Sequence, residues 1–329
     1  MWKHGLVPYR DFPVEYPPGA LPVFVAPAPF ADYASAFGWL MAGCGVALVL
    51  VVAQLRISAA FFVAVSPLLV GSLILTRFDL WPALLATAAM LALLTERHRL
   101  GWGFLGAAVA AKLWPLVIVP LAIVWSLRRG RLRAALVGAA VAALAFVPFA
   151  VIAPHGMWSS LRGQASRPLQ IESLGASLFT TFGHPRIVSS HGSQNVAGHG
   201  TVAAISTLVE VAILFALWFA YARGASTSDR FVRFAVACVC TFIAFGKVLS
   251  PQYLIWLVPL VPLIRGMRGV VATALLALAL VLTQVWFPQR YWDYVYAFHN
   301  AEVVLVRNLV LIVLLGVAAW PRFPESPVD

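Results

Sequence analysis

The residues that could do chemistry in this sequence are a few acids and cations set among long apolar runs. The first of them fall in residues 9–24, YRDFPVEYPPGALPVF, where Asp11 and Glu15 lie among aromatic side chains. Prolines interrupt the stretch repeatedly, and proline lacks an amide donor and restricts the residue before it. The stretch therefore predicts a loop or broken turn, not a regular helix, that carries two candidate catalytic carboxylates.

The cations nearest to such chemistry are two lysines. Only three lysines occur in the chain, and Lys112 and Lys247 both lie within apolar runs. A charge at membrane depth costs about 2.5–3.5 kcal/mol or more, so it needs a partner or a task. One interpretation is that both lysines simply reach the lipid headgroups. The other is that they bind an anionic lipid headgroup, such as a phosphate, together with Arg77 and Arg167.

Acids beside such cations would have a separate task. An enzyme that moves a sugar from a lipid phosphate needs a carboxylate as general base for the acceptor hydroxyl, and cations to stabilise the departing phosphate. The other candidate pocket residues are Tyr9, Arg10, Tyr16, Asp79, Gln170, Glu172, Gln252 and Tyr253. Structural salt bridges with Arg10, Arg77 or Arg167 are the alternative for the acids, and an interfacial belt is the alternative for the aromatic residues. Glu210 lies in the middle of an apolar run, and we expect it to be a packing residue away from this set.

We expect no metal, no cofactor and no disulfide. Cys44, Cys238 and Cys240 lie in apolar runs, where buried free thiols are the simplest interpretation. HGSQNVAGHG, residues 191–200, contains two histidines, but its glycines indicate a flexible loop rather than a metal site.

Composition indicates the elements that hold these residues. The 329-residue chain is 62% hydrophobic and 11% charged, whereas soluble proteins are closer to half apolar and a quarter charged. Apolar runs recur with about the 20-residue length that crosses a hydrocarbon core as a helix. They include 34–55, 57–75, 134–153, 202–222 and 269–287. The sequence therefore predicts an all-α polytopic membrane protein.

The net charge of +11 does not indicate a nucleic-acid partner, because the arginine clusters lie at the ends of the apolar runs. Such clusters are typical of cytoplasmic loops that face anionic lipids. With these clusters inside, the runs predict about 11 transmembrane helices, or 12 if an upstream helix is missing. We expect one integral membrane domain over residues 1–329, with extracytoplasmic loops at 1–33 and 154–201.

Two apolar stretches, 101–127 and 234–264, are basic at both ends, so both ends favour the cytoplasm. A single spanning helix cannot satisfy this condition, but a short helical hairpin can. Each stretch contains a proline soon after its lysine, and proline breaks a helix. We therefore expect two short hairpins with Lys112 and Lys247 at their outer tips.

Five segments in series resemble glycosyltransferase family 87. They are GLVPYRDFPVEYPP (5–18), RFDLWPA (77–83), AAKLWPL (110–116), RPLQIESL (167–174) and GKVLSPQYLIWLVPL (246–260). The resemblance implies a GT-C-fold mannosyltransferase of the plasma membrane that uses polyprenyl-phosphate-mannose as donor. It implies inverting transfer, in an α-1,2 linkage, to a glycolipid or glycan acceptor on the outer face. It also implies that the loop before YPP lies at the active site, and that Lys112 and Ser250–Tyr253 line the donor pocket.

Similar proteins have a first transmembrane helix and a catalytic aspartate upstream of the PYRDF turn. The sequence begins at Met1, a few residues before this turn, so we expect the true start to lie further upstream. A base supplied by Asp11 or Glu15, or an inactive protein, are the alternatives. The main rival from another class is a multi-pass transporter or lipid flippase, because two Lys-Pro hairpins hint at a repeat.

Overall fold

The computed structural model of the protein describes residues 5–320. These residues are mostly helical and group into two compact units, where the sequence led us to expect one domain. Unit 1 contains residues 5–64 and 72–166, and unit 2 contains residues 65–71 and 167–320. Each unit is described by itself below.

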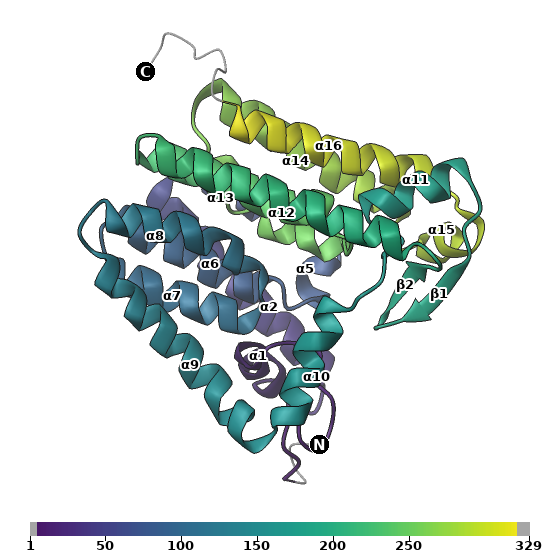
Figure 1. Ribbon diagram of the computed structural model, residues 1–329, viewed down its shortest axis with the longest axis horizontal. Coiled ribbons are helices and arrows are strands. Elements are labelled where there is room, and N and C mark those ends of the chain that lie inside the picture. The colour runs from purple at the N-terminus through teal and green to yellow at the C-terminus, as the bar shows by residue number, and fades with distance from the viewer. Residues whose placement is uncertain (1–4, 321–329) are drawn as a thin grey trace. The chain divides into compact units, whose positions relative to one another are not determined.

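Unit 1 is a bundle of helices of unequal length (Figure 1). Its elements are η2 (Pro18–Ala20), α1 (Leu21–Val25), α2 (Tyr33–Leu55), α3 (Ile57–Val65), α5 (Leu73–Thr76), α6 (Leu80–Leu94), α7 (His98–Ala111), η3 (Trp114–Ile118), α8 (Val119–Leu127), η4 (Leu132–Ala134), α9 (Ala135–Ile152) and α10 (Pro154–Ala165). Helix α6 packs against both α2 and α7, and α7 packs against α9. Most of the side chains of α6 are buried, so this helix forms the core of the unit.

Unit 2 is a second bundle, in which α12, α13, α14 and α16 run side by side (Figure 1). Its elements are α4 (Pro67–Val70), α11 (Leu174–Phe182), β1 (Ile187–Ser190), β2 (Ser193–Val196), α12 (Gly200–Arg223), α13 (Ser228–Phe245), η5 (Pro251–Trp256), η6 (Val261–Leu263), α14 (Gly266–Trp286), α15 (Tyr291–Ala297) and α16 (Ala301–Ala319). Helix α16 contacts α11, α13 and α14.

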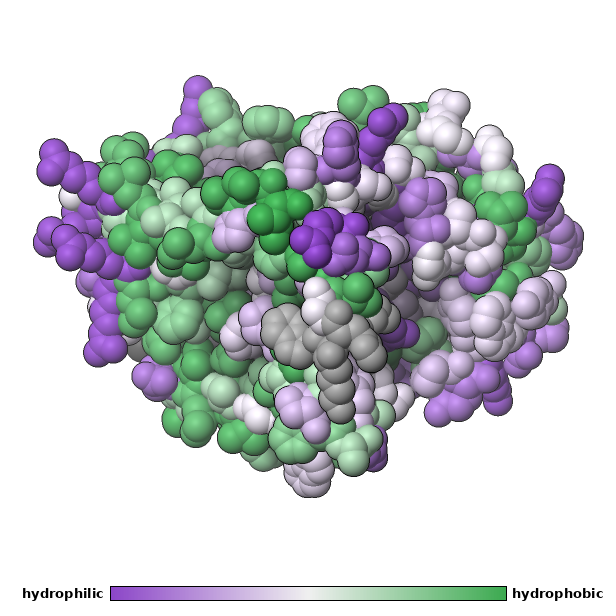
Figure 2. All heavy atoms as spheres, turned by 90° about the horizontal axis from the view of Figure 1, so that it is seen from below, coloured by the Kyte–Doolittle hydropathy of each residue, from purple (hydrophilic) through white to green (hydrophobic). Residues whose placement is uncertain are grey.

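The helices confirm a polytopic membrane protein. Among the described residues, five helices are long and apolar enough to cross a membrane. They are Tyr33–Leu55, Leu132–Ile152, Gly200–Arg223, Gly266–Trp286 and Ala301–Ala319. Large apolar side chains are exposed along these helices, and hydrophobic residues cover broad areas of the face in Figure 2. Soluble proteins rarely expose such areas, whereas lipid chains cover them in a bilayer. The remaining apolar helices are shorter, so these five represent only part of the expected 11 crossings.

The two expected hairpins are helices broken just before or at a lysine. Helix α7 ends at Ala111, Lys112 has an extended backbone, and η3 begins two residues later with a proline in its first turn. Helix α13 ends at Phe245, and η5 begins at Pro251, shortly after Lys247. Proline fits a first helical turn because the amide it lacks has no partner there.

Two segments expected to be irregular contain regular structure. The segment 154–201 holds α10, α11 and an antiparallel hairpin of β1 and β2. The hairpin turns at His191 and Gly192, which both have positive φ, as a two-residue turn between twisted strands requires. The expectation of a flexible loop at 191–200 is therefore wrong where β2 forms. The expectation of a loop through residue 24 is also wrong, because α1 begins at Leu21 with a proline in its first turn.

Candidate active site

The candidate base Asp11 closes a tight turn near the start of the described chain. Its carboxylate accepts hydrogen bonds from the Val7 amide at 2.7 Å and from the Arg10 guanidinium at 2.9 Å, while its own amide donates to the Val7 carbonyl. The bond from Arg10, followed by the bond from Val7, lowers the pKa of Asp11 to about 2. A carboxylate with so low a pKa is a weak base at neutral pH. In this arrangement Asp11 holds the turn together.

Glu15 lies on the same loop in a different environment. Its side chain is exposed, and its backbone carbonyl accepts hydrogen bonds from Gln164 at 2.9 Å and Ser160 at 3.4 Å, both on α10. The Tyr9 hydroxyl donates to the carbonyl of Tyr16 at 2.5 Å. The backbone of this loop is therefore fixed, while the Glu15 carboxylate lies at its surface.

Close backbone contacts fix the loop at two further points. A Cβ on Gly156 of α10 would overlap the Tyr9 carbonyl. A Cβ on Gly19 would lie only 2.5 Å from the backbone of Ala110, near the end of α7. Both positions thus need glycine, since a side chain there would push the loop away from its neighbouring helix. The second contact places the loop two residues from Lys112.

Lys112 and Asp79 form an ion pair in unit 1. The ammonium lies 2.7 Å from the Asp79 carboxylate, and the two side chains are only 12% and 2% exposed. The ammonium also lies 4.8 Å from the Phe78 ring centroid and 5.6 Å from that of Tyr16. Burial of this kind excludes the interpretation that Lys112 only reaches the headgroups. A salt bridge was one expectation for Asp79, but with Arg77; the partner is Lys112, and Arg77 is exposed.

Lys247 is positioned in unit 2 by Gln170. The Gln170 amide donates to the Lys247 carbonyl at 2.9 Å, and its side chain donates to the Ser250 hydroxyl at 3.0 Å. Lys247 itself is half-buried. Burial lowers the pKa of Lys247, and the carboxylate of Glu210 acts in the opposite direction. Two motifs that lie far apart in sequence, RPLQIESL and GKVLSPQY, are therefore joined directly.

Three other residues of unit 2 were predicted to belong to the site, and two of them make contacts within the unit. The Arg167 guanidinium donates to the His191 carbonyl and to the Ser193 hydroxyl, both at 3.2 Å, and so supports the β-hairpin turn. Gln252 is half-buried, and the ring of Tyr253 stacks on Trp256 with centroids 4.2 Å apart.

Glu172 is buried inside unit 2. Its carbonyl accepts hydrogen bonds from Arg307 at 3.1 Å and Asn308 at 3.2 Å, both on α16. Burial raises the pKa of Glu172 to about 7, and the positive charge of Arg307 acts in the opposite direction. The side chain is not exposed, and the Glu172 carbonyl joins residues 167–173 to α16.

Sequence reasoning misplaced Glu210. We expected it away from the predicted set, but its carboxylate lies beside Gly246, the residue before Lys247. The only sequence signal was a single acid in an otherwise apolar run, and it did not identify the partner.

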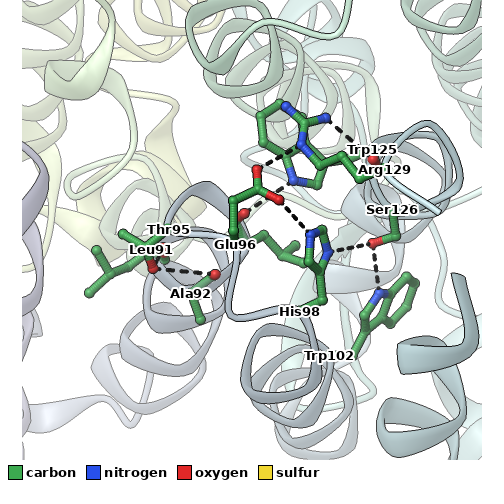
Figure 3. A network of polar contacts seen from close by, with 10 residues as sticks. Leu91, Ala92, Thr95, Glu96, His98, Trp102, Trp125, Ser126 and Arg129 are labelled. Atoms are coloured by element: carbon green, nitrogen blue, oxygen red, sulfur yellow. Dashed lines mark hydrogen bonds and ion pairs between the residues drawn. The ribbon is translucent and has the colours of Figure 1, made fainter. Parts of the chain in front are cut away.

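Sequence reasoning also missed a polar network where α6, α7 and α8 meet (Figure 3). His98 contacts Glu96 through Nε2 at 2.8 Å and Ser126 through Nδ1 at 3.3 Å, and the Trp102 indole donates to the Ser126 hydroxyl at 3.0 Å. Arg129 donates to Glu96 at 2.7 Å. Ser, His and Glu in series can activate a nucleophile, but Ser126 is fully buried. The network is therefore structural.

These features define a class of protein: a polytopic membrane protein in which each of two units carries a lysine and a carboxylate at a broken helix. The chain belongs to glycosyltransferase family 87, whose family pattern matches residues 14–251. The protein is thus a membrane glycosyltransferase. No curated protein matches the chain. The matched region includes Glu15, Asp79, Lys112 and Lys247, whereas Asp11 precedes it.

Proposed function

We propose that the protein transfers mannose from polyprenyl-phosphate-mannose to a hydroxyl of a glycolipid or glycan on the outer face of the plasma membrane. The transfer would invert the anomeric centre and form an α-1,2 linkage. The observation that carries this proposal is the half-buried Lys247 at the break after α13. A cation within an apolar helical unit suits a ligand that combines an anionic headgroup with a lipid chain.

The two lysines have different roles in this proposal. Lys247 binds the donor phosphate as a compact point charge, and Gln170 holds the backbone of Lys247 in place. Lys112 already has a full counter-charge in Asp79, so it acts mainly by holding that carboxylate and the neighbouring aromatic rings. Within unit 2, Arg167 contributes further positive charge, and Gln252 and Tyr253 contact the donor; within unit 1, Arg77 adds positive charge near Asp79.

The reaction needs a base and a stabilised leaving group. The acceptor oxygen attacks C1 of the sugar, the bond from C1 to the phosphate oxygen breaks, and polyprenyl phosphate leaves. The hydroxyl proton passes to a carboxylate. Glu15 suits this task better than Asp11, because the carboxylate of Asp11 is occupied by Arg10 and Val7.

A transfer assay in membranes tests the proposal. Radiolabelled polyprenyl-phosphate-mannose is the donor, native lipid extract is the acceptor, and Lys247→Ala is compared with Lys247→Arg. We expect Lys247→Ala to lose transfer, Lys247→Arg to keep part of it, and the control Arg131→Ala, at an exposed position, to match the wild type. Full activity in Lys247→Ala would contradict the phosphate role, and no activity in the wild type with this donor would contradict the donor assignment.

A lipid transporter is the second candidate function. Transporters bind charged groups at broken helices near the bilayer midplane, and Glu210 lies midway along α12, beside the residue that precedes Lys247. In proteoliposomes, movement of labelled lipid between leaflets without formation of a glycosylated product would favour this candidate.

A further inference from the structure

Glu210 is an acidic residue in an apolar helix, where its side chain needs a partner. Helix α12 is long and apolar enough to cross a membrane, and Glu210 is its one acidic residue. It lies about 15 Å along the axis from Gly200, far from either end. A carboxylate at such a depth needs a cation or a hydrogen-bond donor.

The candidate cation is Lys247, which follows the end of α13 by two residues. A Cβ on Gly246 would lie 3.5 Å from Oε2 of Glu210, so the carboxylate lies against the chain immediately before Lys247. Helices α12 and α13 pack against each other. Burial lowers the pKa of Lys247, and the carboxylate of Glu210 acts in the opposite direction, as a nearby acid should.

Unit 1 contains a matching arrangement. Lys112 follows the end of α7, and Asp79 precedes the start of α6, which packs against α7. In both units, a lysine ends or follows a helix, a proline-led 3-10 helix comes next, and an acid comes from the neighbouring helix. This shared order of lysine, 3-10 helix and neighbouring acid supports a role for Glu210 at Lys247 like that of Asp79 at Lys112.

We propose that Glu210 is a positioning residue for Lys247, whose carboxylate, beside Gly246, holds the lysine at the helix break, where an anionic headgroup such as a phosphate can bind. The role in catalysis rests on the proposed function, but the pairing does not.

Other charged groups near Lys247 have partners of their own. Two of them lie on residues 167–173, the segment in which the Gln170 amide donates to the Lys247 carbonyl. Of these, Arg167 donates to the β-hairpin turn, and Glu172 is buried, with its carbonyl accepting from Arg307 and Asn308. On η5, the titratable group is Tyr253, whose ring stacks on Trp256. Glu210 is therefore the charged group that acts on Lys247 from α12.

The pairing can be tested directly because the chain has only three lysines. Reductive methylation with ¹³C gives one resolvable amine signal for each lysine, which Lys→Arg variants assign. We expect Glu210→Gln to shift the Lys247 pKa downward, Glu210→Asp to shift it less, and Lys112 to stay unchanged. Glu302→Gln, which removes an exposed acid on α16, is the matched control. An unchanged Lys247 pKa in Glu210→Gln overturns the proposal. Glu210→Asp keeps the test available if Glu210→Gln does not fold.

The pH profile of transfer then tests the role in catalysis. Lysine binds phosphate in its protonated form, so activity falls as pH rises through the Lys247 pKa. In Glu210→Gln this fall should begin at a lower pH, with a larger effect on KM for the donor than on kcat. An unchanged profile, together with a lowered Lys247 pKa, overturns the catalytic role. If the wild type transfers no sugar from the lipid-phosphate donor, the proposed function fails, while the amine titration still decides the pairing.

Discussion

The ammonium of Lys112 and the carboxylate of Asp79 meet at 2.7 Å although 33 residues separate them in sequence. Both groups are almost fully removed from solvent, and two aromatic rings face the ammonium. The attraction between two such charges offsets the cost of removing both from water only while both are present. The pair therefore joins the end of α7 to the start of α6.

Lys112→Ala should destabilise unit 1, because it leaves the carboxylate of Asp79 buried without its cation. We expect a loss of about 3–5 kcal/mol, and partial recovery when Asp79→Leu is combined with Lys112→Met. Denaturant unfolding in detergent micelles measures both. A Lys112→Ala variant that is as stable as the wild type but inactive would instead favour direct binding of the donor by Lys112.

Glu15→Gln should reduce transfer more than Asp11→Asn does. A lost general base costs on the order of 10²–10⁴ in rate, whereas Asp11 is already occupied by Arg10 and the Val7 amide. Initial rates at saturating donor measure the difference. The reverse order of the two variants would assign the base to Asp11.

The stability of the wild type should depend on pH through Glu172. Burial raises its pKa from 4.5 to about 7, so the folded state favours the protonated acid. Its contribution is therefore fully present below pH 4.5 and is lost as pH rises toward 7. Relative to Glu172→Gln, the wild type should lose up to about 3 kcal/mol over this range.

Thermal unfolding of both proteins between pH 4.5 and 8 measures this effect of Glu172. The control is Glu302→Gln, which should follow the wild type because Glu302 is exposed. Parallel curves for the wild type and Glu172→Gln would show that Glu172 is ionised in the folded protein.

Ser126→Ala should weaken the contact between α7 and α8. The Ser126 hydroxyl contacts both the Trp102 indole and Nδ1 of His98 (Figure 3). Its removal therefore leaves both of these buried groups without this hydrogen-bond partner. A buried group without its partner costs about 1–3 kcal/mol. Thermal unfolding should show the loss, and the control Ser58→Ala, at an exposed position of α3, should not.

The sequence predicted the helices better than the contacts between residues on different helices. Apolar runs were enough to predict helices such as α2 and α14, and the lysine–proline spacing predicted both breaks. The ion pair of Asp79 was expected with Arg77, because nearness in sequence was the only available guide. Its partner depends on how α6 packs against α7, and packing brings distant residues together without a local signal. The same limit explains why the sequence did not place Glu210 beside Gly246.

Each broken helix also affects its lysine through the backbone. Lys112 is the C-cap of α7, and Lys247 follows α13 by two residues. The carboxyl end of a helix carries the negative pole of the macrodipole, which stabilises a cation and opposes an anion. A glutamate at either position would therefore meet repulsion from the helix end and from the neighbouring acid. The backbone thus selects the sign of the charge at both breaks, before any substrate is bound.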